Sequence, residues 1–271
     1  MKRIAAVTIV ALAVTAVATA ARSGPAPEPF ATNGSFSACI DPSFPPMEYY
    51  PKVGSKTPTG FDVDLAKAVA KRWAVKVKFV PTVFTGLLAG LGAKKCDVIW
   101  SGIFVTPERT KQFPAVSYMK THRALLVRGG NPEHIRSPSD LSGKTVATEA
   151  GTKYVDALKA LNKKLKAQGK SGIRIQTYPK ASDASAAVVA GRASADLTQD
   201  TEAAFRITQT KGKFQIAYLY PQSDTFGVYY RRDESAVGPA LKREFKALKG
   251  NGGLRRLAKK YNLPLKDLGL K

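Results

Sequence analysis

Segments with helical spacing of apolar residues alternate with strand-like segments in the first half of the chain. An apolar strand is predicted over 37–41, a helix over 61–73, and a strand with alternating polarity over 75–80. A short apolar helix is predicted over 84–92, and another strand over 97–102. Strands and helices in this order form a parallel sheet, with the helices as crossover connections.

A second series of the same kind follows. Strands are predicted over 143–151, 173–178 and 195–200, and the helices between them are a lysine-rich segment after residue 151 and residues 182–191. A last strand at 226–232 precedes two basic C-terminal helices. The pattern predicts two α/β lobes, and such sheets bind ligands beyond the carboxyl ends of their strands.

The first twenty residues have the pattern of an export signal. Lys2 and Arg3 precede an apolar run that ends at Ala20, where small residues suit cleavage. An uncleaved anchor is the alternative, but the run is about 17 residues long and a bilayer span needs about 20. Residues 21–34 are predicted to be a flexible leader. We expect a periplasmic protein without a lipid anchor, because no Cys lies near the cleavage site.

The chain is strongly basic. Its 271 residues include 43 Lys+Arg and 20 Asp+Glu, for a net charge of +23. Two segments, 151–180 and 241–271, hold most of this excess beside helically spaced apolar residues, which indicates the solvated faces of amphipathic helices. Docking to an acidic membrane surface or partner is the alternative. Export, and the lack of aromatic residues among the basic ones, argue against a nucleic-acid partner.

The sequence contains no pattern typical of metal binding or ordinary hydrolysis. His122 and His134 lie apart from any nucleophile motif, and no P-loop or Cys/His metal spacing occurs. We expect no metal and no cofactor. Cys39 and Cys96 lie in or beside predicted strands, and two buried free thiols are the favoured interpretation. A disulfide is possible, because an exported protein meets an oxidising compartment.

Six segments, taken in order, resemble the motifs of the family 3 extracellular solute-binding proteins, which are amino-acid receptors of ABC importers. The most characteristic is GFDVDL at 60–65. The others are DPSFPPME at 41–48, FTGLL at 84–88, CDVI through TPER at 96–109, DLSGKTV through GT at 140–152, and GR through the last Asp at 191–200. The resemblance extends from residue 36 to about residue 262.

The resemblance implies a two-lobed periplasmic-binding-protein fold of type II, in which two strands form the hinge. Lobe 1 would comprise residues 35–121 and 224–271, and lobe 2 residues 122–223. The implied protein is a monomer that delivers an amino acid to an ABC permease and catalyses nothing. A periplasmic enzyme similar to cyclohexadienyl dehydratase and a ligand sensor are the alternatives.

The resemblance also assigns residues that would bind the α-carboxylate and the α-ammonium group of an amino acid. Arg109 carries a planar guanidinium that can hold a carboxylate with two hydrogen bonds. Asp200, from the other lobe, would hold the α-ammonium group, and the backbone N–H groups of Gly102 and Thr152 would add donors. The alternatives are a surface salt bridge between Arg109 and Glu108, and a strand-end cap at Asp200.

The remaining matches concern the ligand side chain. Phe44 and Phe84 match aromatic walls, although plain core packing is their alternative. Phe104 replaces a hydroxyl-bearing residue of the family, so its ring would narrow the pocket. Asp41 and Glu149 match positions that face the side chain, which predicts a polar or cationic amino acid. The complete predicted set is Asp41, Phe44, Phe84, Ser101, Gly102, Phe104, Arg109, Glu149, Thr152 and Asp200.

Overall fold

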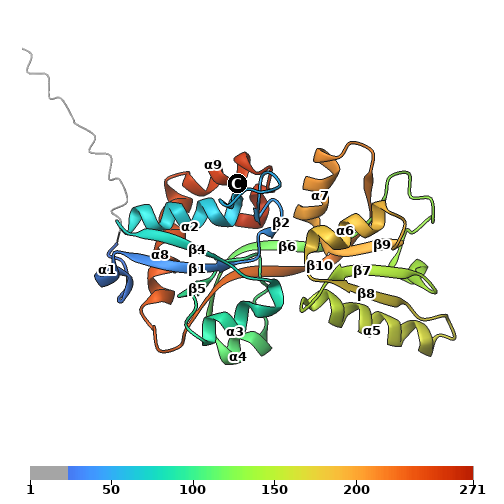
Figure 1. The fold of residues 1–271 in the computed structure, drawn as a ribbon, viewed down its shortest axis with the longest axis horizontal. Coiled ribbons are helices and arrows are strands. Elements are labelled where there is room, and N and C mark those ends of the chain that lie inside the picture. Colours follow the sequence, from blue (N-terminus) through green and yellow to red (C-terminus); the bar gives the residue numbers. More distant parts are fainter. Residues whose placement is uncertain (1–23, 271) are drawn as a thin grey trace, which may run out of the picture.

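The computed structural model describes residues 24–270, which fold into two lobes joined by two long strands (Figure 1). The predicted signal peptide, residues 1–20, lies outside the described residues. Within 24–270, no helix combines the length and the apolar character needed to cross a membrane.

Lobe 1 contains the first strand–helix series and the C-terminal helices. Strand β1 (Ser35–Ile40) pairs in parallel with both β4 (Lys76–Pro81) and β5 (Val98–Ile99). A short ribbon of β2 (Ser43–Phe44) and β3 (Glu48–Tyr49) follows β1. The helices are α1 (Phe30–Asn33), α2 (Phe61–Arg72), η1 (Phe84–Gly86), α3 (Leu87–Gly92), α4 (Pro107–Gln112), α8 (Val237–Gly250), α9 (Gly253–Lys260) and η3 (Leu265–Leu268).

Lobe 2 repeats the arrangement. Strand β7 (Thr145–Glu149) pairs in parallel with both β8 (Arg174–Tyr178) and β9 (Ala195–Gln199). Its helices are η2 (Pro138–Leu141), α5 (Lys153–Ala167), α6 (Ala181–Val189) and α7 (Asp200–Gln209).

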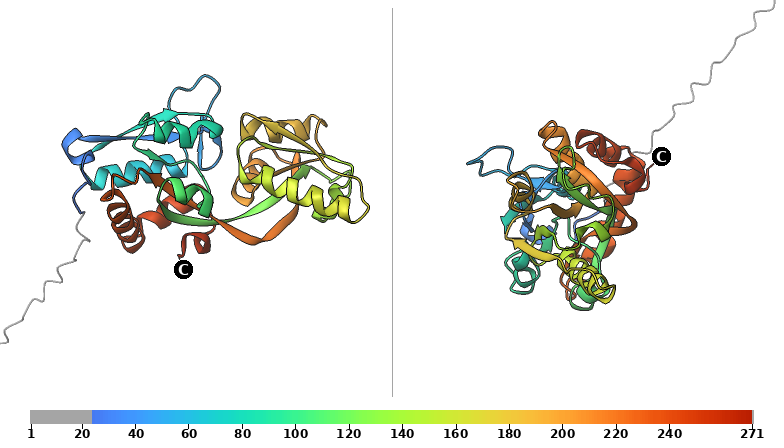
Figure 2. Two further views of the ribbon diagram at one scale, coloured as in Figure 1. Left: turned by 90° about the horizontal axis from the view of Figure 1, so that it is seen from below. Right: turned by 90° about the vertical axis from the view of Figure 1, so that its right-hand side faces the viewer.

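Two antiparallel strands, β6 (Ala115–Arg128) and β10 (Phe214–Tyr230), connect the lobes. They lie at the centre of an eight-stranded sheet with the order β4-β1-β5-β10-β6-β9-β7-β8. Figure 2 shows both strands running from one lobe to the other. The parallel strands of both lobes are therefore tied to one shared pair, which is the expected two-strand hinge.

Helix α2 illustrates how the sequence anchors lobe 1. Phe61, Leu65 and Val69 recur at one-turn spacing and are fully buried. Gly60 precedes them with a φ of 132°, and a Cβ at this position would lie 2.2 Å from the carbonyl oxygen of Met47. Only glycine therefore allows the helix to begin so close to the β2–β3 ribbon.

The predicted helices and strands are all present, although some differ in length. The predicted strand at 226–232 overlaps the end of a much longer β10, which begins at Phe214. Helices α4 and α7 were not predicted. Both are short, and α7 directly follows β9, so the apolar pattern contains no gap that would separate strand from helix.

The expectation of a flexible leader at 21–34 is wrong for its described part. Phe30 is 1% exposed in α1, and its ring stacks on Phe36 at 5.3 Å and approaches Trp73 at 6.2 Å. Arg243 also donates a hydrogen bond to the carbonyl of Pro25. A single buried aromatic side chain thus outweighs the Pro- and Ala-rich composition that suggested a linker.

The favoured interpretation of two free thiols is also wrong. Cys39 and Cys96 form a disulfide with an S–S distance of 2.04 Å. The sheet brings them together, because Cys39 in β1 lies directly opposite Ile99 in the parallel neighbour β5. Sequence spacing could not reveal this pairing, since the two residues are 57 positions apart.

The lysine-rich segment forms α5 as predicted. Tyr154, Leu158 and Leu165 are buried on its inner face. Lys159 and Lys163 on the same helix are exposed to solvent. In the C-terminal region, α8 and α9 likewise bury apolar residues, and their basic side chains lie largely outside that face.

Candidate ligand-binding site

A narrow cavity lies between the lobes, where loops follow the carboxyl ends of parallel strands. In this conformation the side chains nearly fill it. Lobe 1 contributes Phe44, Glu48, Phe84, Ser101, Gly102, Phe104 and Arg109, and lobe 2 contributes Glu149, Thr152, Lys153 and Tyr154. The predicted residues are therefore brought together on this wall, with the exceptions of Asp41 and Asp200.

Arg109 enters the cavity from the first turn of α4. The hydroxyl of Thr106 caps this helix by accepting a hydrogen bond from the Arg109 backbone N–H at 3.3 Å. The guanidinium donates to the Phe104 carbonyl at 3.1 Å and lies 5.6 Å from the centre of the Phe84 ring. These contacts hold the side chain in one position, and Arg109 is only 6% exposed.

Among residues 24–270, no carboxylate forms an ion pair with Arg109. The alternative of an Arg109–Glu108 salt bridge is thus not what the structure has, since Glu108 pairs with Lys153 instead. Burial lowers the pKa of Arg109, because desolvation disfavours its charge. A buried guanidinium without an acidic partner is well suited to receive the carboxylate of a ligand.

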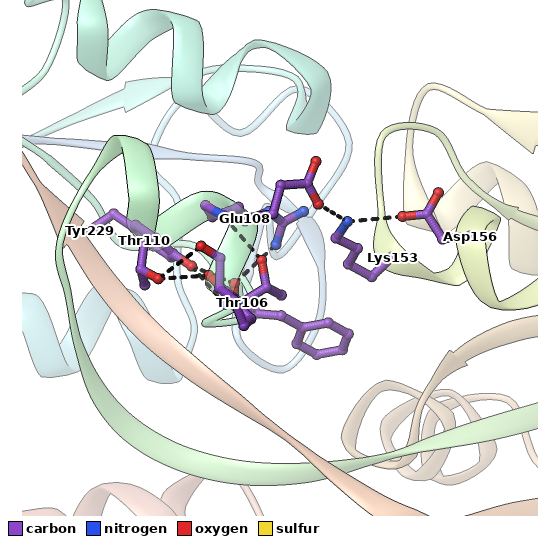
Figure 3. Close-up of polar contacts among 9 residues, drawn as sticks. Thr106, Glu108, Thr110, Lys153, Asp156 and Tyr229 are labelled. Carbon is purple, nitrogen blue, oxygen red and sulfur yellow. Dashed lines mark hydrogen bonds and ion pairs between the residues drawn. The ribbon is translucent and has the colours of Figure 1, made fainter.

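Lys153 and Glu108 join the two lobes at the mouth of the cavity. Lys153, the first residue of α5 in lobe 2, forms an ion pair with Glu108 of α4 in lobe 1 (Figure 3). Lys153 also contacts Asp156 on its own helix at 3.0 Å. The lobes are therefore in direct contact in this conformation.

Phe104 lines the cavity. Its ring stacks on Phe226 of the hinge strand β10 at 5.6 Å and meets the edge of Tyr154 at 5.7 Å. Phe44 meets Phe226 edge-on at 6.2 Å. Both Phe44 and Phe104 belong to the main hydrophobic cluster while they line the cavity, so they act as core and as wall at once.

A chain of hydrogen bonds fixes the strand ends of lobe 1. The backbone N–H of Asp41 donates to the Ser101 hydroxyl at 2.7 Å, and that hydroxyl donates to Glu48 Oε1 at 2.9 Å. Asp41 Oδ2 accepts from the backbone N–H of Phe84 at 2.7 Å. Ser101 thus lines the cavity, and Asp41, which does not line it, holds the backbone of Phe84 in place.

The backbone N–H of Gly102 is not the free donor that was expected. It donates to Asp62 Oδ2 at 2.8 Å, and the same oxygen accepts from the hydroxyl of Tyr118 at 2.7 Å. The φ of Gly102 is +48°, and a Cβ there would lie 2.9 Å from the Phe44 ring. Gly102 therefore lets the chain pass close to the aromatic wall, but it offers a ligand no N–H group in this conformation.

Asp200 does not line the cavity. It is the first residue of α7, and its Oδ1 accepts hydrogen bonds from the Thr121 hydroxyl at 2.6 Å and from the Thr201 backbone N–H at 2.8 Å. This arrangement corresponds to the strand-end cap. The carboxylate is oriented by the hinge strand β6 and by its own helix, which corrects the expectation that it lies opposite Arg109.

Buried acids dominate the rest of the wall. Glu149 is 5% exposed, and its Oε1 accepts from the backbone N–H of Ala181 at 3.2 Å. Burial raises the pKa of Glu149 well above its usual value, and nearby Asp41 adds to the effect. Burial likewise raises the pKa of Glu48, with a further contribution from Asp62, whose own pKa rises to about 6. These carboxyl groups therefore lie in an environment that favours compensation by a positive charge.

Glu48, Lys153 and Tyr154 were not singled out from the sequence, although they line the cavity. Glu48 is the last residue of the segment at 41–48 that resembles the family's first strand and turn. Lys153 and Tyr154 directly follow Thr152 at the start of α5. Their positions within or next to recognised motifs were the only sequence signal that could have identified them as cavity residues.

Residues 36–264 match the profile of the bacterial extracellular solute-binding proteins, family 3. The chain belongs to this family. The solute-binding protein is 25% identical over 229 residues to the L-cystine-binding protein TcyJ of Escherichia coli (strain K12). The aligned region covers 84% of this chain and 82% of the relative. It is 28% identical over 222 residues to the arginine-binding extracellular protein ArtP of Bacillus subtilis (strain 168), with coverage of 80% and 82%.

Solved structures show the same two-lobed fold. An ancestral arginine-binding protein bound to arginine superposes on this solute-binding protein with a TM-score of 0.77 at 27% identity, over 84% of this chain and 98% of the other. The ancestral amino acid-binding protein AncCDT-1, described as a precursor of cyclohexadienyl dehydratase, gives a TM-score of 0.77 at 29% identity, over 86% and 97%.

Proposed function

We propose that this solute receptor binds an amino acid, with polar or cationic side chains favoured, and delivers it to the permease of an ABC importer. The observation that carries the proposal is the charge arrangement of the cavity. Among residues 24–270, Arg109 is buried without an acidic ion-pair partner, and Glu48 and Glu149 are buried in the same wall without a basic one. An amino acid with a cationic side chain carries one negative and two positive charges. Its negative charge suits Arg109, and its positive charges suit the two glutamates.

The α-carboxylate would bind Arg109, whose planar fork matches a carboxylate in two parallel hydrogen bonds. Thr152 at the start of α5 lies on the opposite lobe and places the positive end of that helix near the cavity. The positive groups of the ligand would then face Glu48 and Glu149, which line the same cavity. Relatives named for arginine binding support the preference for a cation.

Ligand binding would stabilise closure of the lobes about β6 and β10. We place the lobe boundaries at 121/122 and 223/224, where Thr121 pairs with Asp224 and His122 with Ser223 in the hinge. The mature protein would be a periplasmic monomer, cleaved after residue 20 and not lipid-anchored. Closure around the ligand would create the surface that the permease recognises.

A thermal-shift screen of residues 21–271 against the standard amino acids tests the function. Arginine, lysine or a polar amino acid at about 100 times its Kd should raise Tm by about 5–10 °C. Calorimetry on the responding ligands then gives affinity and stoichiometry. A screen in which no amino acid binds, or in which only aliphatic or acidic ones do, would overturn the proposal.

One observation favours a second candidate. AncCDT-1 is itself an amino-acid-binding protein and is described as a precursor of an enzyme. A buried carboxylic acid such as Glu149 could in principle donate a proton to a leaving hydroxyl. We expect no turnover, and incubation with prephenate or arogenate should yield neither phenylpyruvate nor phenylalanine. Product formation that disappears in Glu149→Gln would establish the enzyme instead.

A further inference from the structure

A short two-stranded ribbon of lobe 1 reaches across the boundary to lobe 2. Strands β2 and β3 pair Ser43 with Tyr49 and Phe44 with Glu48. Phe44 and Glu48 line the interlobe cavity. Ser43 and Tyr49, the neighbouring pair, contact lobe 2. One residue pair of the ribbon therefore faces the cavity, and the next pair meets the other lobe.

Ser43 and Tyr49 each have a partner in lobe 2. The Ser43 hydroxyl accepts a hydrogen bond from the backbone N–H of Ala181, the first residue of α6, at 3.2 Å. The centre of the Tyr49 ring lies 5.3 Å from that of Phe205 on α7, and the two ring planes are tilted by 57°. This distance is typical of an attractive aromatic pair. The ribbon is thus in contact with two separate helices of lobe 2.

Phe205 adds little to the interior of its own lobe. Helix α7 packs into lobe 2 through the buried residues 201–203, and Ile207 packs against the hydrophobic cluster of that lobe. Among residues 24–270, neither Phe205 nor Tyr49 belongs to a hydrophobic cluster, and both side chains are half-buried. Their contact therefore stabilises the approach of the lobes and not the fold of either lobe.

The aromatic pair forms a narrow bridge between the lobes. Tyr49 and Phe205 line each of two hollows at the lobe boundary, and both hollows include residues of both lobes. Water therefore reaches the two rings when the lobes separate. Exposure of apolar ring surface to water is unfavourable, so the pair favours the arrangement in which the lobes are in contact.

The second contact between the lobes lies on the other side of the hinge strands. Lys153 of α5 forms its ion pair with Glu108 of α4 there. In Figure 1, α4 and α5 lie below β6 and β10, whereas α7 and β2 lie above them. Contacts on both sides restrain twisting of the lobes about the hinge as well as their separation.

We propose that Tyr49 and Phe205 form an aromatic latch that favours closure of the lobes and sets the rate at which the receptor releases its ligand. This inference rests on the proposed amino-acid receptor and adds the residues that control release. Neither ring lines the interlobe cavity, so the latch acts in the free protein as well as in the complex. A ligand that contacts Phe44 or Glu48 holds the same ribbon in place, which couples an occupied cavity to the latch.

Stopped-flow kinetics with L-arginine tests the latch. Phe205→Ala and Tyr49→Ala should each speed arginine dissociation by about tenfold, because the ring contact is lost. The association rate should change by less than about twofold, because the latch forms after the ligand has entered. Tyr49→Phe keeps the ring and should release arginine at the wild-type rate. Thr208→Ala, at an exposed position of α7 beside one of the same hollows, is the matched control and should also behave as the wild type.

A double variant shows whether the two rings act together. Tyr49→Ala combined with Phe205→Ala should release arginine no faster than either single variant, because each single change already removes the contact. Additive effects, or wild-type release rates in both single variants, overturn the inference and leave the receptor function intact. A large fall in the melting temperature of ligand-free Phe205→Ala also overturns it, because that result would place the ring in the core of lobe 2.

X-ray scattering of the ligand-free protein separates the latch from the proposed function. Loss of the latch should lower the ratio of closed to open molecules by about tenfold, so Phe205→Ala should have a larger radius of gyration than the wild type. Thr208→Ala should have the wild-type radius. Equal radii for Phe205→Ala and the wild type overturn the inference. If the radii differ as expected but no amino acid binds, the latch stands and the proposed function fails.

Discussion

Lys153 of lobe 2 forms an ion pair with Glu108 of lobe 1 at the mouth of the interlobe cavity (Figure 3). Glu108 directly precedes Arg109 on α4, and Lys153 directly follows Thr152. The pair therefore joins the two helix starts from which the ligand carboxylate would be held. A contact of this kind should exist only in the closed state.

Glu108→Gln should speed ligand release without altering the fold. The Glu108 side chain is 68% exposed, so solvent and salt weaken the ion pair, and its loss should accelerate dissociation by no more than about fivefold. Stopped-flow dissociation measures this rate. Asp156→Asn removes the other partner of Lys153 within its own helix and should leave the rate nearly unchanged. Equal rates for Glu108→Gln and wild type at low salt would contradict a role in closure.

Arg109→Ala should reduce affinity for the amino acid by more than about 100-fold, because it leaves the ligand carboxylate buried without a partner. Asp200→Asn should reduce the affinity far less, because Asp200 does not line the cavity and its Oδ1 accepts from the Thr121 hydroxyl and the Thr201 backbone N–H. Calorimetry compares the two variants, and circular dichroism confirms that both remain folded. A loss in Asp200→Asn as large as in Arg109→Ala would show that Asp200 reaches the ligand in another conformation.

Reduction of the Cys39–Cys96 disulfide should destabilise lobe 1. The bridge closes a separation of 57 residues, and its removal should lower the free energy of unfolding by about 4 kcal/mol on loop-entropy grounds. Urea denaturation with and without a reductant measures the difference. A double variant, Cys39→Ala with Cys96→Ala, should match the reduced protein and be insensitive to the reductant. Unfolding that is the same in both redox states would contradict the expectation.

Asp196→Asn should flatten the decline of stability between about pH 4 and pH 8. Burial, aided by Glu202, raises the pKa of Asp196 from 3.8 to about 8. Its contribution to stability is therefore full below about pH 4 and is lost as the pH rises to about 8. The asparagine can still accept from the Ser185 hydroxyl, so the variant should gain a few kcal/mol over the wild type between pH 5 and pH 8. Urea denaturation at both pH values measures this gain, and parallel curves for both proteins would contradict it.

The sequence was most informative where a single element carried its own pattern. Phe61, Leu65 and Val69 recur at the spacing of one helix face, and α2 buries all of them. The motif around Arg109 likewise predicted a cavity residue, because the turn, the proline and the arginine are neighbours in the chain. The order of strands and helices was sufficient to predict two lobes.

Relationships between distant segments required the tertiary structure. The sheet register decides that Cys39 and Cys96 are bonded. The packing of Phe30 against Phe36 and Trp73 turns a presumed leader into part of lobe 1. Asp200 was assigned from its motif, but its direction depends on Thr121 in a separate strand.

The sequence by itself thus determined the family, the alternation of elements and most of the residues on the cavity wall, because these follow from local patterns and from the order of short motifs along the chain. Only the tertiary structure decided which charges lack partners. Arg109 and Glu149 are ordinary charged residues in the sequence, and the fold buries them on one cavity wall from two lobes, without an ion-pair partner among residues 24–270. Pairing and burial are properties of the folded surface between lobes, and no local pattern encodes them.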